Sequence, residues 1–303
     1  MTTLITLFAN NILPIFLAAG AGYLASKYLR IEPRSVSRIA FYIFSPCLIF
    51  TILTTTELDG EDVLLMVGFT IAAVLSIGGV AWIVGRSIRF ERRLLVAIVL
   101  TAMFGNAGNY GLSLNLFAFG EAALAYASLY FVITAILMYT IGVFIASLGQ
   151  SSIIGAIIGL ARVPVIYAVV LALLFNYFSW KLPLPLDRTV TLLGNAAIPL
   201  LMVLMGIQLS HAKWDGKTLA LSVSNSLRLV VGPILALGLS VIFGLSGVAR
   251  QAGVTESAMP TAIMMTVLAT EYKVEPSFVT TAVFTSTLLS PLTVTLIIAY
   301  LGA

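Results

Sequence analysis

The chain has 303 residues, of which 60% are hydrophobic and 9% are charged, and its mean hydropathy is +1.09. Soluble domains carry about 25% charged residues, so this composition excludes a soluble globular enzyme and indicates a polytopic membrane protein. The net charge of +4 is modest. The single cysteine, Cys47, lies in an apolar run and excludes both a disulfide framework and a cysteine metal site.

Apolar runs of about 20 residues, long enough to cross a bilayer as a helix, occur ten times along the chain. In chain order they predict helices over 5–26, 36–56, 62–85, 94–119, 122–147, 162–179, 187–210, 217–244, 250–271 and 276–301. A polar connection over 148–159 separates the fifth helix from the sixth. The N-terminal stretch has no basic segment before its apolar run, so we expect a first membrane-spanning helix rather than a cleaved signal peptide.

Lys and Arg residues are distributed unequally between the two sets of alternate connections. One set holds twelve of them: Lys27, Arg30, Arg34, Arg38, Arg86, Arg89, Arg92, Arg93, Arg162, Lys213, Lys217 and Lys273. The other set holds three: Lys181, Arg188 and Arg250. Because basic connections stay in the cytoplasm, we expect an inner-membrane protein with both termini on the non-cytoplasmic side. We interpret the clusters as topology anchors in preference to nucleic-acid or specific lipid sites.

Two pairs of predicted helices share features at a separation of five helices. The second and seventh helices have a proline near the middle, Pro46 and Pro199, and each is followed by an Asp-Gly pair. The fourth and ninth both contain a polar interruption. Five helices per half is an odd number, so the halves must have opposite orientations in the membrane. We therefore expect two inverted repeats, over 1–148 and 160–303.

The fourth predicted helix contains the most informative stretch, FGNAGNYGLSLNLFAFG at 104–120. Residues 105–111 include three glycines and two asparagines, and each glycine costs about 1 kcal/mol relative to alanine in a helix. A broken backbone is tolerated in a bilayer only where protein or a water-filled cavity satisfies the freed N–H and C=O groups. We expect a discontinuous helix that lines a polar cavity near the midplane, as in many secondary transporters.

The ninth predicted helix is interrupted by Pro260, which cannot donate a backbone hydrogen bond. A proline kink alone is common in membrane helices. Its place in the helix that matches the fourth suggests that two half-helix N-termini meet near the midplane, where they favour an anion. The candidate substrate-binding residues are Asn106, Asn109, Tyr110, Ser113, Asn195, Pro260 and Thr261.

Arg228 and Glu256 are the charged residues that we expect well inside the predicted helices. A charge near the bilayer centre costs at least about 2.5 kcal/mol, so we expect the two to form a pair. The pair is either structural or functional, with Glu256 exchanging a proton or Arg228 attracting an anionic substrate. His211 is expected at the membrane interface. Histidine side chains ordinarily change charge near neutral pH, which permits pH sensing. The chain has no GxxxxGK[ST], HExxH or GxSxG motif, so we expect no catalytic, metal or cofactor site.

The motifs resemble those of the auxin efflux carrier family, in particular its bacterial members. The resemblance extends to the PIN-type carriers of plants and, more remotely, to the bile-acid sodium symporters. It is carried by GNAGNYGLSLNLFAFG, SPCLIFTIL, IPLLMVLMGIQL and AMPTAIMMTVLATEY. It implies ten helices in two inverted repeats, with helices 4 and 9 broken and crossing. It also implies a scaffold of helices 1, 2, 6 and 7, a mobile core of helices 3–5 and 8–10, and often a homodimer. The family's crossover asparagine and proline correspond to Asn109 and Pro260, whereas Ser113 stands where the family commonly has proline.

These observations together predict an all-α integral membrane protein that is a secondary transporter of a small organic anion. The resemblance implies an elevator-type alternating-access mechanism and a carboxylate substrate, such as malate, malonate or an auxin-like acid. Coupling to H⁺ or Na⁺ stays open. The alternatives are a cation/proton antiporter or sodium-coupled symporter of the same broad fold, and a sensor or channel. An intramembrane enzyme has little support, because no nucleophile–base set or metal-ligand set is present.

Overall fold

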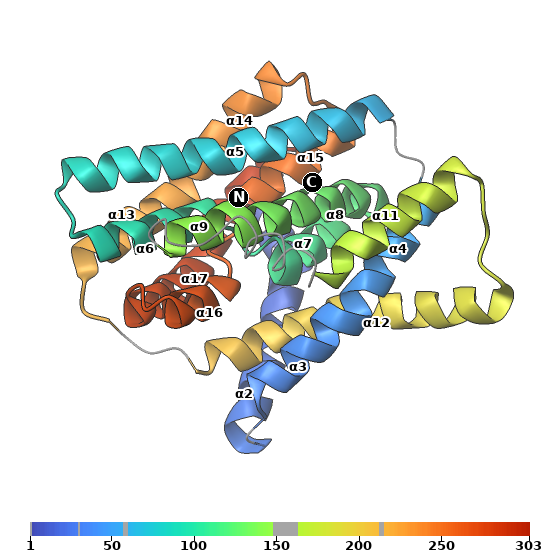
Figure 1. Cartoon of the computed structure of the whole chain (residues 1–303), viewed down its shortest axis with the longest axis horizontal. Coiled ribbons are helices and arrows are strands. Elements are labelled where there is room, and N and C mark those ends of the chain that lie inside the picture. The colour runs from blue at the N-terminus through green and yellow to red at the C-terminus, as the bar shows by residue number, and fades with distance from the viewer. Residues whose placement is uncertain (1, 30, 57–59, 148–162, 212–214) are drawn as a thin grey trace.

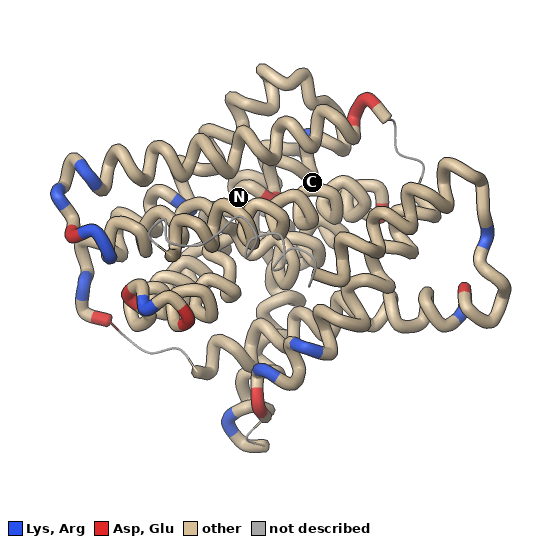
Figure 2. The backbone as a smooth tube through the Cα atoms, in the orientation of Figure 1, with Lys and Arg blue, Asp and Glu red and all other residues tan. Residues whose placement is uncertain are grey.

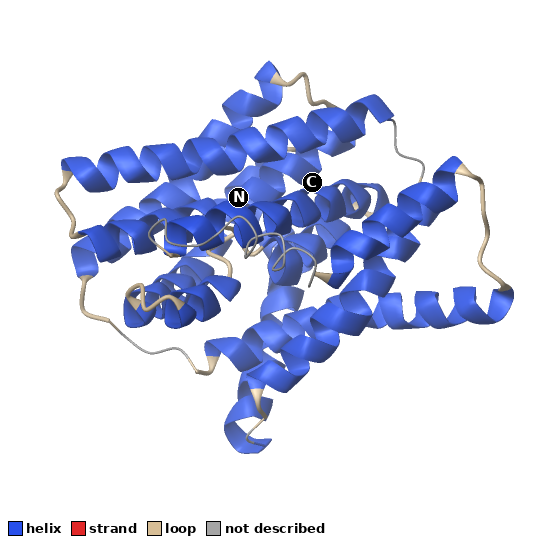
Figure 3. Cartoon of the chain, in the orientation of Figure 1, coloured by secondary structure: helices blue, strands red, loops and turns tan. Residues whose placement is uncertain are grey.

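The computed structural model describes residues 2–29, 31–56, 60–147, 163–211 and 215–303 (Figure 1). All regular secondary structure in these ranges is helical (Figure 3), which confirms the predicted all-α class. The first half contains α1 (Thr2–Leu7), η1 (Phe8–Ile12), α2 (Leu13–Leu29), α3 (Pro33–Ile39), η2 (Ala40–Phe44), α4 (Ser45–Thr55), α5 (Gly60–Ser87), α6 (Arg92–Met103), η3 (Ala107–Gly111), α7 (Leu112–Phe119), α8 (Glu121–Leu137), η4 (Met138–Gly142) and α9 (Val143–Ala146). The second half contains α11 (Pro164–Tyr177), α12 (Leu184–Leu209), α13 (Thr218–Ser226), η5 (Leu227–Val231), α14 (Gly232–Ile242), α15 (Gly247–Ser257), α16 (Met264–Glu271) and α17 (Pro276–Tyr300). The η segments are π-helical turns that continue from one α-helix to the next or begin one.

Seven of the described helices are long and apolar enough to cross a membrane. They are Leu4–Leu29, Pro33–Thr55, Gly60–Ser87, Glu121–Ala146, Leu184–Leu209, Thr218–Ile242 and Pro276–Tyr300. Each agrees with a predicted helix to within three residues at either end. The predicted sixth helix corresponds to the shorter apolar helix Pro164–Tyr177, and the predicted connection 148–159 lies outside the described residues.

The fourth and ninth predicted helices are both interrupted, as the sequence predicts. The fourth ends at Met103 and resumes at Ala107 as the π-helical turn η3. The ninth ends at Ser257 and resumes at Met264. The first interruption falls at the glycine-rich stretch and the second at Pro260, which are the local features that disfavour a continuous helix.

The helices pack in two groups. In the lower right of Figure 1, α12 packs against α2 and α4, and α4 packs against α11. Gly22 lies against the backbone of Val203 and Gly206 against that of Ala19, so a Cβ at either glycine would overlap the facing helix. Small residues permit this close approach in membrane proteins. The second group contains α5, α6, α8, α14 and α15, in which α5 contacts α6, α8 and α14.

Charged residues lie mostly at the ends of the helices. Figure 2 shows Lys and Arg gathered on the left, around the turn from α5 to α6, and at the bottom, around α3. Two charged residues are instead buried within the helical bundle: Arg228 is 2% exposed and Glu256 is 0% exposed. Both lie beside the two helix interruptions, where the candidate site is found.

Candidate functional site

The two helix interruptions contact each other through their backbones. The N–H of Asn106 donates to the carbonyl of Pro260 at 2.7 Å, and the N–H of Ala262 donates to the carbonyl of Phe104 at 2.8 Å. Gly105 and Thr261 form an antiparallel β-bridge between these bonds. Backbone groups that leave a helix in a membrane need such partners. The crossing of the two breaks therefore supplies the hydrogen bonds that each helix loses.

Arg228, in η5, holds the helix ends that meet at this crossing. Its Nε donates to the carbonyl of Met259 at 2.7 Å, and its Nη2 donates to the carbonyl of Ser257 at 2.6 Å. Its Nη1 donates to the carbonyls of Ala102 at 2.9 Å and Met103 at 3.3 Å. The last carbonyls of a helix have no partner within it and carry a partial negative charge. One guanidinium thus binds the carboxyl ends of both α6 and α15.

The expected ion pair between Arg228 and Glu256, both described residues, is not formed. The donors of Arg228 are directed to backbone carbonyls, and the carboxylate of Glu256 accepts a hydrogen bond from Asn115 Nδ2 at 3.0 Å. The second oxygen, Oε2, is buried and has no hydrogen-bond partner among the described residues. Gly111 lies so close to this carboxyl group that a Cβ would overlap it. The prediction was wrong because carbonyl groups, which every residue carries, can replace an acidic partner.

A cavity of about 830 Å³ reaches the crossing from one side of the molecule. Its buried end is lined by Gly105, Asn106 and Asn109, and its lining also includes the exposed residues Arg34 and His211. Arg38 and Glu271 complete the set of charged lining residues. This volume lies within the range of about 300–1,000 Å³ that is usual for small-molecule sites. The cavity therefore joins a basic entrance to the crossed helix breaks.

The two asparagines at the buried end differ in their hydrogen bonds. Asn109 Nδ2 donates to Gln208 Oε1 at 3.3 Å, and Gln208 Nε2 donates to Ser37 Oγ at 3.1 Å. Among the residues that the structure describes, Asn106 Nδ2 has one hydrogen-bond partner, the sulfur of Met205 at 3.9 Å, and a thioether is a weak acceptor. A ligand oxygen would be a stronger partner for the Asn106 amide than this sulfur.

Comparison with known proteins places this arrangement in a family. The chain matches the family described as Membrane transport protein over residues 7–153 and 151–298. The chain belongs to this family, which includes the auxin efflux carriers. The resemblance seen in the sequence motifs is thereby confirmed, and the protein is a membrane transporter.

Similar proteins come from archaea, bacteria and plants. An "Uncharacterized transporter" of Methanothermobacter thermautotrophicus is 26% identical over 262 residues, which are 86% of each chain. A "Putative malonate transporter" of Rhizobium meliloti is 26% identical over 306 residues, which cover 94% of this chain and 92% of that protein. The "Auxin efflux carrier component 3a" of Oryza sativa subsp. japonica is 28% identical over 131 residues, which cover 41% of this chain and 21% of the rice protein.

Four further residues predicted to bind substrate in this transporter lie near the crossing but do not line the cavity. Pro260 and Thr261 hold the crossing itself: Thr261 Oγ1 donates to the carbonyl of Thr101 at 2.9 Å. Tyr110 and Ser113 are both 0% exposed. Tyr110 packs edge-to-face on Phe16, with 5.9 Å between the ring centroids. Their place is structural in this conformation.

Asn195 is the predicted binding residue that lies elsewhere. It is exposed on α12 and does not line the cavity. The carboxamide that α12 does bring to the site is Gln208, which the sequence reasoning did not single out. The sequence feature that could have indicated Gln208 is its position as a lone polar side chain in the apolar run that ends α12.

The side chains of the site are suited to reversible binding. Among the described residues, no group of three or more His, Cys, Asp or Glu side chains is placed to hold a metal ion. The buried polar side chains that line the cavity are the carboxamides of Asn106 and Asn109 and the hydroxyl of Thr134. Such groups bind an oxyanion or a hydroxyl by hydrogen bonds and release it without a change of charge.

Proposed function

We propose that this membrane transporter carries a small organic anion by alternating access. The observation that carries the proposal is the cavity, which leads from Arg34 and Arg38 to the amides of Asn106 and Asn109. Arginines at an entrance raise the local concentration of anions. Neutral amides then bind a carboxylate without the strong attraction of a buried ion pair, so the anion can leave on the other side. Relatives named for malonate transport and for auxin efflux support a carboxylic acid as the substrate class.

We propose that the chain crosses the inner membrane ten times, in inverted repeats over 1–148 and 160–303. The seven long helices, the short α11 and the two interrupted helices together supply ten segments. The crossing supports the proposal, because it pairs the fourth helix with the ninth, which are equivalent in such a repeat. Both termini then lie on the non-cytoplasmic side of the membrane. A homodimer, as the family resemblance implies, completes this proposal.

We assign the moving parts by their packing. The group of α2, α4, α11 and α12 forms the scaffold, and the helices that carry the crossing form the moving core of an elevator. The bond from Asn109 to Gln208 joins core to scaffold, so it breaks when the core moves. Because the cavity is lined by Arg34 and Arg38, the positive-inside rule makes this the cytoplasm-facing conformation.

The proposed substrate class is tested by transport into vesicles with a matched pair of variants. Wild-type protein should accumulate labelled malonate, malate or indole-3-acetate in proteoliposomes under a proton, sodium or voltage gradient. Asn109→Ala should reduce the rate at least tenfold, because a hydrogen bond to a charged ligand is worth about 1.5–3 kcal/mol. Asn195→Ala, the same change at an exposed site, should leave the rate unchanged. Absence of flux for every carboxylate under every gradient would sink the proposal.

A second candidate is a cation/proton antiporter or a sodium-coupled symporter. It is favoured by Glu256, a fully buried carboxyl group whose Oε2 has no hydrogen-bond partner. A proton or a sodium ion would satisfy such an oxygen. In this case Glu256→Gln should abolish sodium- or proton-dependent flux while exchange of internal for external substrate persists. Sodium-driven proton flux in the absence of any carboxylate would favour the antiporter.

A further inference from the structure

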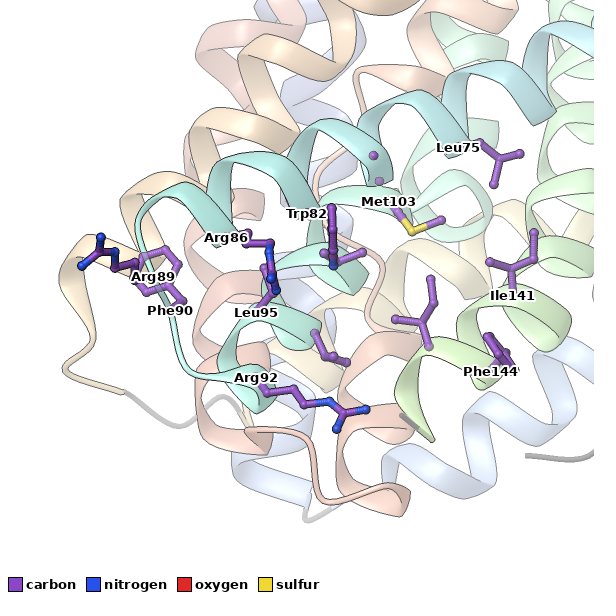
Figure 4. Close-up of a pocket in the computed structure, with 15 residues that line it drawn as sticks. Leu75, Trp82, Arg86, Arg89, Phe90, Arg92, Leu95, Met103, Ile141 and Phe144 are labelled. Carbon is purple, nitrogen blue, oxygen red and sulfur yellow. The ribbon is translucent and has the colours of Figure 1, made fainter. Parts of the chain in front are cut away.

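A second hollow lies away from the crossing, between α5, α6 and the η4–α9 segment (Figure 4). This α5–α6 groove has a volume of about 1010 Å³ and shares no lining residue with the cavity at the crossing. Leu75, Ile141 and Phe144 form part of an apolar wall along most of its length. Arg86 and Arg92 lie at one end. The groove is therefore amphipathic along its length, with an apolar body and a cationic end.

The length of the groove matches one leaflet of a bilayer. From Leu75 to Arg86, α5 rises by about 17 Å at 1.5 Å per residue, and half of the hydrocarbon core is about 15 Å. Trp82 lies beside the cationic end, and the guanidinium carbon of Arg86 is 5.5 Å from the centroid of its ring. Tryptophan is enriched at the level of the lipid headgroups. An acyl chain along the wall thus places its headgroup beside the arginines.

The arginines define the charge of that headgroup. Figure 4 shows Arg86 and Arg92 at the end of the groove beside Trp82, whereas Arg89 is directed away from it. Guanidinium groups match the oxygens of a phosphate and bind them bidentately. A zwitterionic headgroup brings its own cation to the same place, and an anionic headgroup does not. No acidic residue lines the groove in the part of the chain that the structure describes.

We propose that the α5–α6 groove binds one anionic phospholipid, with an acyl chain against α5 and η4–α9 and the phosphate at Arg86 and Arg92. The sequence alone favoured a topology anchor for this basic cluster. An anchor requires charge at the interface but no hollow, and the apolar channel that leads away from the charges points to a lipid. The inference goes beyond the proposed transport function and does not depend on it.

The headgroup is tested on the purified full chain by native mass spectrometry in a mild detergent. Palmitoyl-oleoyl-phosphatidylglycerol is compared with the matching phosphatidylcholine. The wild type should retain one phosphatidylglycerol in preference to phosphatidylcholine. The double variant Arg86→Gln, Arg92→Gln should weaken this retention by about thirtyfold, at roughly 1 kcal/mol per basic residue. Arg93→Gln, an adjacent exposed arginine that does not line the groove, should change it less than threefold.

The acyl-chain wall is tested with a glycine that faces open space. Gly79 lines the groove, and a Cβ at this position would meet nothing within 4 Å, so we expect the side chain of Gly79→Leu to occupy the groove. It should lower retention of phosphatidylglycerol at least tenfold. Gly238→Leu on α14 is the control, because a Cβ at Gly238 also meets nothing within 4 Å. It should leave retention unchanged. An apparent melting temperature measured without added lipid selects variants that are folded.

Three results would overturn the proposal. Equal retention of both lipids by the wild type would show that the headgroup charge is not recognised. Unchanged retention in both the arginine and the Gly79→Leu variants would place the bound lipid elsewhere. A change from dimer to monomer in Gly79→Leu would identify the groove as a contact between two copies of the chain.

Discussion

The two helix breaks are joined by a β-bridge but differ in the side chains that they give to the cavity. The first break places the carboxamides of Asn106 and Asn109 at the buried end. The second contributes Ala262 and Ile263, while its polar residue Thr261 is directed into the protein, toward Thr101. Two breaks that pair through their backbones therefore need not contribute equally to recognition of a ligand. In the proposed site, the first break supplies the groups that bind the ligand, and the second completes the hydrogen bonds that hold the first in place.

The largest loss of stability is expected from a substitution of Arg228, the side chain on which both breaks depend. Arg228→Leu leaves four carbonyls at the ends of α6 and α15 without the guanidinium. Buried acceptors without partners cost about 1–3 kcal/mol each, so we expect a loss of at least about 3 kcal/mol. Denaturant titration in detergent measures it. Arg188→Leu, at an exposed arginine, is the control and should change stability by less than about 0.5 kcal/mol. Equal stability of the two variants would contradict the role of Arg228.

The next effect separates ligand binding from folding at the first break. Asn109→Asp keeps the size of the side chain but introduces a negative charge, which repels an anion and removes an amide donor. We expect affinity for the carboxylate substrate to fall by about 10- to 100-fold, and the melting temperature without ligand shows separately how much stability the buried charge costs. Thermal-shift titration with malonate and indole-3-acetate measures this. Asn195→Asp should bind like the wild type, and equal losses in both variants would remove Asn109 from the site.

At the second break we expect a substitution to lower stability and to leave substrate affinity almost unchanged. Thr261→Val removes the hydrogen bond to the carbonyl of Thr101 and keeps the shape of the side chain. We expect a loss of about 1 kcal/mol in stability and less than a twofold change in substrate affinity. The same denaturant and thermal-shift titrations report both quantities. A tenfold loss of affinity without loss of stability would show that the second break also contacts the ligand.

The smallest change in stability is expected at an ion pair near the helix ends. Lys217 at the start of α13 binds Glu275 at the start of α17. The hydrogen bond that Lys217 Nζ donates to the carboxylate of Glu275 raises the pKa of Lys217 above its ordinary value. The pair therefore contributes fully below the ordinary lysine pKa, and its contribution is lost as the pH rises through the raised value. Because the Lys217 side chain is 41% exposed, we expect less than about 1 kcal/mol. Lys217→Gln should remove this part of the alkaline pH dependence of the melting temperature, and an unchanged profile would contradict it.

Local sequence features were sufficient to predict where the helices break. Gly105, Gly108 and Gly111 weaken a helix wherever they occur, and Pro260 removes a donor regardless of its neighbours. The apolar runs likewise predicted the long helices, because the bilayer fixes their length. These properties depend on a few adjacent residues and on the solvent, so they can be read without the fold.

The partners of buried groups could not be predicted in the same way. Glu256 was assigned to Arg228 because it was the one acid expected at membrane depth, yet Arg228 binds carbonyls from residues 31 and 126 positions away. Backbone carbonyls have no signature in the sequence. Asn195 and Gln208 illustrate a second difficulty: at about 100° per residue they lie about 140° apart around α12. A largely apolar helix does not reveal which of these faces is turned to the site.

The shared guanidinium also orders events during synthesis. The carbonyls of Ala102 and Met103 receive their hydrogen bonds from Arg228, more than 120 residues later in the chain. At about 5–20 residues per second, the ribosome needs roughly 6–25 s to cover this distance. During that interval the end of α6 is in the membrane without its final partner. The interrupted helix of the first half therefore reaches its final hydrogen bonding only after Arg228 in the second half has been synthesised. Until then, the carbonyls of Ala102 and Met103 lack this partner in the insertion machinery or in the lipid.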